Sequence, residues 1–518
     1  MTRLPGARAP IQSYSREINA MRGLNLSDYY QDGDLADCEN LSIRRYPYFT
    51  TRRERQMLDD YSGTVSALTS WEKLVVVMDG HLYYDGVARG EVTDGEKQFA
   101  VVNSKLIIWP DKKYLDMNTL TVNDLAAQTS GTGATFTEDT VTLTSAAADL
   151  TTLFTIGDCV TISGCGTLSG NNRTVVIKAL TADSITITDA AAQAEPFDEG
   201  TESGTISLER EVPDLDFICV SSNRLWGCCN ATKTIHASSL GEPGRFYVNE
   251  GLSTDSYALN VASEGDFTGC CRLSGSVLFW KERTLHKLLG DYPAEYALYD
   301  YNLEGVLTGC HKSMQIVNET LYYMSAHGIY AYSGGTTALL SPEFGEHHFT
   351  DGVAGSDGLN YYLSAREGDE HHLLVYNTIR RTWVREDDTE ALDFTRIGRD
   401  LYFLDASGSI WLADSGRESS SLTWHAQFKP FYETVEGRKG YSKLHLRVQL
   451  PQASYLIAEL RYDGKRWIKA GEIRGGKADA VLLPLTIERC DQFELRVRGK
   501  GQCTILSVLR EFFVGSDA

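Results

Sequence analysis

The chain has 518 residues, of which 42% are hydrophobic and 23% are charged, a balance typical of globular proteins. Its length exceeds that of one ordinary hydrophobic core, so we expect roughly two to four domains. The net charge of −21 argues against binding nucleic acid by generic counterion release, which requires clustered Lys and Arg. No apolar run approaches the roughly 18 residues of a membrane-spanning segment. The N-terminus lacks the apolar segment of a signal peptide, so we expect folding in a cytoplasm.

Residues 1–60 show no repeat, and we predict that they form an N-terminal docking arm. Aspartates within 28–37 precede a segment in which arginines alternate with aromatic residues. The candidate docking residues are Arg44, Arg45, Tyr46, Tyr48, Phe49, Arg52 and Arg53, followed by Arg55. Such a segment could stack on nucleic-acid bases. Because it is short and the rest of the chain is acidic, we favour an arm that docks on the acidic β-propeller predicted below or on a neighbouring subunit.

A repeated hairpin pattern organises much of the chain, and its clearest copy lies at 318–335. Residues 321–323 and 329–332 read as strands that flank a turn at 325–328. The first-strand anchors of the copies are separated by 143, 52, 44, 40 and 40 residues: Leu82, Leu225, Val277, Leu321, Tyr361 and Leu401. An all-strand repeat of roughly 40–50 residues is the period of β-propeller blades. We predict an all-β fold with blade 1 at 61–118 and the remaining blades at 213–414. Six blades are favoured, or seven if the arm or 100–118 supplies one.

Two further β domains are predicted outside the repeat. Residues 119–212 are rich in Thr, Ala, Gly and Ser, and segments there alternate strictly between apolar and polar residues. We predict an inserted small β-sandwich or barrel, because taking about 95 residues out of the long gap restores a spacing of about 48. After a polar linker, residues 422–516 predict a C-terminal β-sandwich. The predicted hairpin turns are Asp79-Gly80, Asp85-Gly86 and Asp463-Gly464.

The sequence contains no motif that we assign to catalysis, and we predict a protein that is not an enzyme and has no cofactor or metal. The clusters Glu346-His347-His348 and Glu370-His371-His372 resemble paired metal ligands. Neighbouring strand residues point to opposite faces, however, so each cluster offers one His to a given site. The segment at 405–411 is the nearest match to the repeated turn of sialidases, with its Asp one place off. A propeller glycosidase with two catalytic carboxylates therefore stays an alternative.

A resemblance to a known family rests on turns and aromatic residues. The matching pieces are Asn223-Arg224-Leu225-Trp226, Ser239-Leu240-Gly241-Glu242-Pro243, Asp266-Phe267-Thr268-Gly269, the stretch from Gly328 to Gly335, the stretch from Val353 to Gly358, Gly23-Leu24-Asn25 and Asp37-Cys38-Glu39-Asn40. With these pieces the chain resembles the propeller-bearing tail nozzle, or packaged-DNA stabilisation, proteins of short-tailed bacteriophages. The likeness covers roughly 20–60 and 213–414.

The resemblance implies a virion protein of a phage tail, assembled in the host cytoplasm. Family members form a ring, usually a hexamer, below the portal and adaptor, and the genome DNA passes through its bore and is retained until ejection. The acidity of the chain agrees with DNA that passes without sequence-specific binding. An alternative is a receptor- or glycan-binding tail-tip propeller that uses 119–212 to contact the host surface. This alternative predicts an aromatic-lined pocket in that module. It is weakened because residues 124–207 contain few aromatic residues, namely Phe136, Phe154 and Phe197.

Overall fold

The computed structural model describes residues 11–58, 61, 63–187, 195–248, 250–435, 437–476 and 480–515. Outside the described residues therefore lie 1–10 and 59–60 of the predicted arm, 62 of predicted blade 1, 188–194 of the predicted insertion, 249 of the remaining predicted blades, and 436, 477–479 and 516 of the predicted C-terminal domain. Strands make up 55% of the structure and helices 3%, which confirms the all-β prediction. The chain divides into two compact units. Unit 1 comprises Met1–Glu72, Lys312–Tyr332 and Thr337–Ala518, and unit 2 comprises Lys73–His311 and Ser333–Thr336.

Unit 2 contains three complete four-stranded antiparallel meanders, in which consecutive strands pair as neighbours. Their strands are β11 (Gln98–Val102), β12 (Lys105–Trp109), β13 (Lys113–Asp116) and β14 (Thr121–Asp124); β21 (Phe217–Ser221), β22 (Arg224–Cys229), β23 (Thr234–Ala237) and β24 (Tyr257–Asn260); and β25 (Gly269–Leu273), β26 (Ser276–Trp280), β27 (Thr284–Leu289) and β28 (Ala297–Asn302), with the 3-10 turn η2 (Pro293–Glu295) before β28. Strands β8 (Lys73–Met78), β9 (His81–Tyr84) and β10 (Val87–Glu91) precede them. Asp79 and Gly80 both have positive φ, as do Asp85 and Gly86, which confirms the predicted hairpin turns.

Unit 1 contains three more meanders of the same kind. Their strands are β29 (Gln315–Val317), β30 (Thr320–Ser325), β31 (Gly328–Tyr332) and β32 (Thr337–Leu339); β33 (Thr350–Ser356), β34 (Asn360–Glu367), β35 (Glu370–Asn377) and β36 (Thr382–Asp387); and β37 (Ala391–Ile397), β38 (Asp400–Asp405) and β39 (Ile410–Leu412), completed by β6 (Gln56–Met57). Strand β7 (Val65–Trp71) packs on β37, and Leu68 donates its backbone N–H to Asp393 at 3.1 Å. Two 3-10 turns are η3 (His311–Ser313) and η4 (Pro342–Phe344). The predicted hairpin at 318–335 is confirmed as β30 and β31, with Leu321 opposite Tyr332.

The stretch 61–118, predicted as one blade, holds strands of two successive groups. The first group is β7–β10, and the second is β11–β14, which ends at Asp124. The sequence left open that 100–118 supplies a blade of its own, and the second group covers that stretch; its tight turns use Asn103 and Lys112, each at φ 53°, in place of Asp-Gly pairs. Asn tolerates this left-handed conformation, whereas Lys gives no turn signal in a sequence. The number of blades stays a prediction.

A closed barrel of six strands lies between β14 and β21, inside the predicted insertion. Its order is β15-β16-β19-β18-β17-β20, with bounds β15 (Gln128–Phe136), β16 (Thr140–Thr144), β17 (Cys159–Ser163), β18 (Thr174–Leu180), β19 (Ser184–Ile187) and β20 (Gly200–Arg210), together with α1 (Leu150–Leu153) and η1 (Ser169–Asn171). The alternating pattern of β16 and β17 places every second residue in the barrel core. The three phenylalanines Phe136, Phe154 and Phe197 are all buried in that core.

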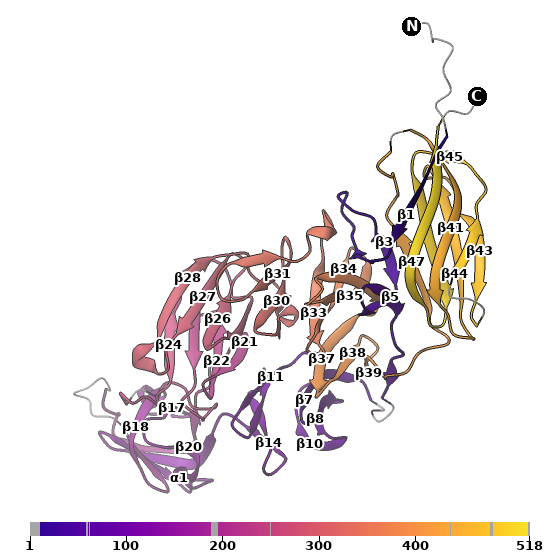
Figure 1. Cartoon of the computed structure of the whole chain (residues 1–518). Coiled ribbons are helices and arrows are strands. Elements are labelled where there is room, and N and C mark those ends of the chain that lie inside the picture. Colours follow the sequence, from indigo (N-terminus) through magenta and orange to yellow (C-terminus); the bar gives the residue numbers. More distant parts are fainter. Residues whose placement is uncertain are drawn as a thin grey trace. The chain divides into compact units, whose positions relative to one another are not determined.

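Two larger sheets of unit 1 contain the C-terminal strands and also the strands of the arm (Figure 1). The seven-stranded sheet runs β4-β5-β47-β41-β44, with β1 on β47 and β45 on β41, and the six-stranded sheet runs β2-β3-β40-β46-β42-β43. The bounds are β1 (Gln12–Ile18), β2 (Gly23–Leu24), β3 (Asp34–Glu39), β4 (Leu41–Arg45), β5 (Tyr48–Thr51), β40 (Thr423–Phe428), β41 (Lys439–Gln449), β42 (Tyr455–Tyr462), β43 (Ile468–Arg474), β44 (Ala480–Pro484), β45 (Arg489–Cys490), β46 (Phe493–Lys500) and β47 (Thr504–Val514). Asp463 and Gly464, both at positive φ, form the predicted turn between β42 and β43.

Aromatic side chains of the two large sheets meet in a shared core. Tyr441 of β41 stacks on Phe493 of β46, with ring centroids 4.1 Å apart, and Phe512 of β47 lies 5.5 Å from Tyr441. Burial of three such rings removes several hundred Å² of apolar surface from water, the dominant stabilising term in folding. The predicted C-terminal sandwich at 422–516 is therefore a two-sheet body in the structure, but five of its strands come from the N-terminal arm.

Candidate functional site: the arginine-rich arm

The predicted docking arm docks on its own chain, within unit 1. Strand β3 pairs with β40, β5 pairs with β47, and β6 pairs with β39. Figure 1 draws β1, β3 and β5 in the indigo of the N-terminus beside the yellow strands β41 and β47. The arm therefore joins two C-terminal sheets and one four-stranded meander by backbone hydrogen bonds that connect residues about 400 positions apart in sequence.

The local sequence explains why the arm forms strands here. Phe49 is buried in β5, and Thr50 donates its hydroxyl to the backbone oxygen of Cys503 at 2.9 Å. Asn40 occupies the turn between β3 and β4 with φ 58°, a conformation that Asn adopts more readily than most residues. Its backbone N–H donates to Glu386 O at 2.5 Å, and its side-chain amide donates to Thr423 O at 2.9 Å.

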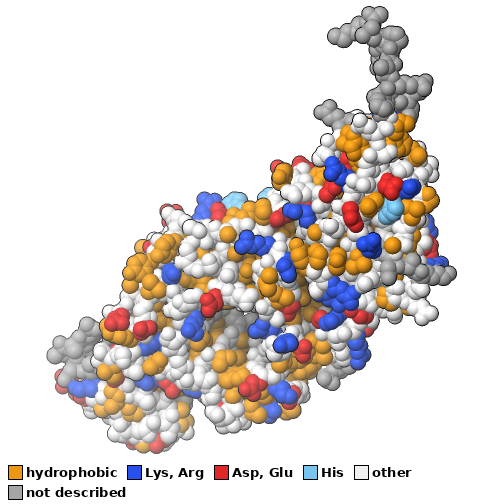
Figure 2. All heavy atoms as spheres, viewed as in Figure 1, with side chains coloured by type: hydrophobic (Ala, Val, Ile, Leu, Met, Phe, Trp, Pro, Cys, Tyr) orange, Lys and Arg blue, Asp and Glu red, His pale blue; other side chains and the backbone are white. Residues whose placement is uncertain are grey.

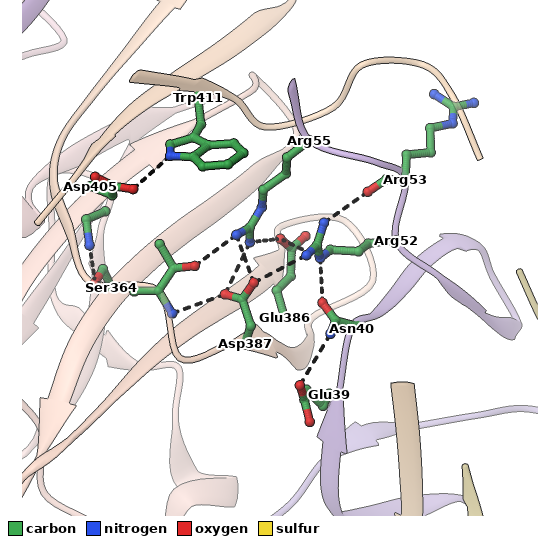
Figure 3. A network of polar contacts seen from close by, with 12 residues as sticks. Glu39, Asn40, Arg52, Arg53, Arg55, Ser364, Glu386, Asp387, Asp405 and Trp411 are labelled. Carbon is green, nitrogen blue, oxygen red and sulfur yellow. Dashed lines mark hydrogen bonds and ion pairs between the residues drawn. The ribbon is translucent and has the colours of Figure 1, made fainter. Parts of the chain in front are cut away.

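The side chains of Arg52 and Arg55 contact two largely buried carboxylates, Glu386 and Asp387, at the end of β36 (Figure 3). Arg55 lies 2.8 Å from Glu386 and 2.8 Å from Asp387, and it donates to the Thr389 hydroxyl at 2.8 Å. The side chains of Arg55, Glu386 and Asp387 are 9%, 10% and 13% exposed, so these contacts are little screened by water.

Arg52 also contacts this cluster. Its Nη2 lies 3.4 Å from Asp387, and its Nε donates to the side-chain oxygen of Asn40 at 2.6 Å. The guanidinium of Arg55 also lies over the ring of Phe403, 5.1 Å from the centroid. Two arginines of the arm thus neutralise two adjacent acidic residues that belong to the body of the chain.

The electrostatics of the cluster favour its charged forms at neutral pH. Burial opposes ionisation of Asp387, but the Arg55 charge, a hydrogen bond from Thr389 and the Arg52 charge outweigh burial and hold the pKa of that carboxyl below its ordinary value. Burial also opposes the charge of Arg55, yet Glu386 and Asp387 together raise its pKa. Burial and the neighbouring Arg55 lower the pKa of Arg52. Arginine stays charged at neutral pH in either case.

The remaining predicted docking residues contact the same unit at its surface. Arg44 forms a two-pronged contact with Glu418 at 2.6 and 2.8 Å, and Arg53 lies 3.2 Å from Asp414. Arg45 donates to Gln449 at 3.0 Å, whereas Tyr48 is half-buried in β5. Tyr46 is 42% exposed, and the Arg380 guanidinium lies 4.6 Å from its ring centroid.

An acidic residue of the arm makes a second contact, with a buried arginine, that the sequence did not reveal. Arg510 of β47 is fully buried and pairs with Glu433 at 3.0 Å and with Asp32 of the arm at 2.8 Å. Its guanidinium lies 3.7 Å from the ring centroid of Phe431. The partners of the arm, Glu386, Asp387 and Arg510, were missed because nothing in a single sequence links residues more than 300 positions apart.

The histidine clusters and the sialidase-like turn have structural contacts of their own. His347 lies 2.7 Å from Glu367, and His371 lies 3.6 Å from Glu390. Within the part of the chain that the structure describes, no group of three or more His, Cys, Asp or Glu side chains could hold a metal ion. Asp405 accepts hydrogen bonds from the backbone of Ser407 and Ser409 and from the indole of Trp411 at 2.7 Å, so it fixes a turn.

Comparisons with known proteins add little to this site. No family model and no curated protein matches the chain. The chain is similar to an exo-β-1,3-galactanase of Phanerochaete chrysosporium, with 7% identity, a TM-score of 0.23, and coverage of 55% of this chain and 92% of that one. It is similar to PorZ, a surface component of the type-IX secretion system of Porphyromonas gingivalis, with 14% identity, a TM-score of 0.34, and coverage of 80% of this chain but 46% of PorZ.

A third similar structure is Hsv2 of Kluyveromyces lactis, with 10% identity, a TM-score of 0.27, and coverage of 51% of this chain and 88% of that one. At such TM-scores these likenesses carry no argument about function. Among the described residues, no helix has the length and apolar character that crossing a membrane would take.

Proposed function

We propose that this chain is a structural protein of a bacteriophage tail, a subunit of a ring through which the genome passes and in which it is retained until ejection. In this proposal the four-stranded meanders, with β7–β10 counted among them, are the seven blades of a β-propeller. The ring is a hexamer that contacts the portal, the adaptor and other tail proteins. The proposed place of the protein is the virion tail.

The observation that carries the proposal is the structural role of the residues on which the resemblance rests. Arg224 is buried, and it donates to the backbone oxygens of Ser238 at 2.9 Å and Ser253 at 2.6 Å. Asp357 accepts the backbone N–H groups of Leu359 and Asn360 at 2.8 and 2.7 Å. Simple alternation of polar and apolar residues requires neither a buried arginine nor an aspartate-bound turn, so a likeness at these positions is more specific than a likeness of strand pattern.

The docking of the arm gives the proposal mechanical support. A wall around packaged DNA must resist outward force, and a segment held by strand pairing with β40, β47 and β39 and by buried ion pairs resists peeling. The charge gives electrostatic support, because 70 acidic residues against 49 basic ones disfavour adhesion of DNA. Figure 2 shows Lys and Arg side chains interspersed with Asp and Glu side chains on the face that it draws.

The mass of the purified full-length chain in solution tests the proposal. Light scattering at low and at physiological salt is expected to give a species near six times 57.4 kDa. A species of that mass at both salts would support a ring held mainly by packing, and one that dissociates at higher salt would support a ring held by charge. A monomer at every protein concentration and both salts would contradict self-assembly into a ring.

A further inference from the structure

A cavity of about 610 Å³ opens in unit 1 beside the docking arm. Its walls come from the arm around Arg22, Tyr29 and Tyr46, from Glu343 of η4, and from the turn between β35 and β36 that carries Arg380 and Arg381. The volume lies within the range of small-molecule sites, roughly 300–1,000 Å³. No residue of the arm network of Figure 3 lines this cavity, so it is separate from the buried arginine cluster.

Arg380 and Arg381 form a positively charged wall of the cavity. Among the described residues, the guanidinium groups of Arg380 and Arg381 have no carboxylate partner; that of Arg380 lies 4.6 Å from the Tyr46 ring centroid. Their turn is fixed by Asn377, whose side-chain oxygen accepts the N–H of Arg380 at 2.8 Å and whose backbone oxygen accepts the N–H of Arg381 at 2.8 Å. The planar guanidinium of an arginine can hold the two oxygens of a carboxylate with two parallel N–H donors.

The acids that line the cavity do not satisfy these arginines. Asp34 already accepts from Arg22 at 3.2 Å, from Asn25 at 2.9 Å and from the backbone of Gln31 at 2.8 Å. Glu343 has one carboxyl oxygen that is buried and without a hydrogen-bond partner among the described residues, and burial raises the pKa of this carboxyl. A buried acceptor without a donor costs free energy, which a ligand hydroxyl group would recover.

Aromatic side chains supply the third wall. Tyr29 is 82% exposed, Tyr46 is 42% exposed, and Tyr30 is half-buried with Lys429 5.3 Å from its ring centroid. Arg380 lies over the ring of Tyr46 and Lys429 over that of Tyr30, so Tyr29 is the tyrosine of this wall that offers an exposed face to the C–H face of a sugar ring. An inorganic anion would leave the Tyr29 face and the Glu343 oxygen unused.

We propose that this cavity binds an acidic sugar residue of a glycan, with its carboxylate on Arg380 and Arg381, its ring against Tyr29 and a ring hydroxyl group donating to Glu343. A neutral sugar lacks the carboxylate, and a nucleoside phosphate would bring a second negative charge toward Glu343. This site does not depend on the proposed tail function, since it rests on unit 1 alone.

The test is to titrate the full chain separately with methyl β-glucuronide, methyl β-glucoside, adenosine monophosphate and inorganic phosphate. Ligand-observed NMR measures the binding of each probe. We expect binding of the glucuronide, and binding of the neutral glucoside at least about tenfold weaker, because the glucoside lacks the charge-assisted contact with the arginines. Equal binding of both glycosides, or tighter binding of the phosphate-bearing probes, would overturn the proposal.

Variants connect the binding to this cavity. Arg380→Ala with Arg381→Ala is expected to weaken glucuronide binding at least about tenfold, and Tyr29→Ala is expected to weaken it without affecting folding, because that side chain is exposed. The matched control is Arg466→Ala, which removes an exposed arginine from the turn after Asp463 and should leave binding unchanged. Glucuronide binding that survives both Tyr29→Ala and the arginine pair, with melting temperatures unchanged, would place the ligand elsewhere and refute the site.

Discussion

Replacing Arg55 by Ala is the sharpest test of how the arm is held. The change removes the guanidinium that lies 2.8 Å from both Glu386 and Asp387, in a cluster whose side chains are no more than 13% exposed. Breaking a buried ion pair by removing one partner costs about 3–5 kcal/mol, because the other charge stays buried without compensation. Arg52 remains 3.4 Å from Asp387 and compensates in part. We therefore expect a loss near the lower end of that range, about 3 kcal/mol.

Urea denaturation of the full chain, followed by tryptophan fluorescence, measures this loss. The matched control is Arg53→Ala, two residues away, whose side chain is 38% exposed and whose partner Asp414 is 53% exposed at 3.2 Å. An exposed pair contributes at most about 1 kcal/mol, so the control should shift the unfolding midpoint little. Equal shifts for the two variants, or a loss below about 1 kcal/mol for Arg55→Ala, would refute the reasoning that burial gives the cluster its strength.

Three further predictions concern packing and titration. Phe49→Ala leaves a cavity where β5 meets β47 and should cost about 3–5 kcal/mol in the same urea assay; a loss below about 1 kcal/mol would show that the arm is not packed there. The folded-state pKa of Asp387 is depressed, so its ionisation stabilises the fold above the unfolded pKa of about 3.9, and this stabilisation is lost as pH falls through the folded pKa. Between pH 5 and 3 the stability of Asp387→Asn should therefore fall less steeply than that of the unaltered chain, and parallel curves would argue against the ion pair. Burial lowers the pKa of His236 to about 4, so its NMR resonances should not titrate between pH 5 and 8; a midpoint near 6.5 would contradict its burial.

Local features of the fold were predictable from the sequence. The hairpin at 318–335 and the turns at Asp79, Asp85 and Asp463 follow from aromatic strands and Asp-Gly pairs, whose conformations are decided by neighbouring residues. The alternation of apolar and polar residues within 128–210 likewise predicted half-buried strands. It left open whether they form a sandwich or the closed barrel of the structure. These predictions succeeded because each depends on a few consecutive residues.

Long-range pairing was not predictable in the same way. Five strands of the arm enter sheets whose other strands lie beyond residue 422, and β6 completes the sheet of β37–β39. The sequence marked Arg52 and Arg53 alike as docking residues, but Arg52 is buried against Asp387 whereas Arg53 pairs at the surface. Burial depends on what the whole fold brings together, and no local pattern distinguishes the two arginines.

Electron microscopy of the purified full-length protein tests the central claim, assembly into a ring around a bore, most directly. The account predicts closed particles of one rotational order with a central opening, in agreement with the mass measured in solution. Fields of single, unassembled particles at every protein concentration, or open filaments in place of closed rings, would contradict it.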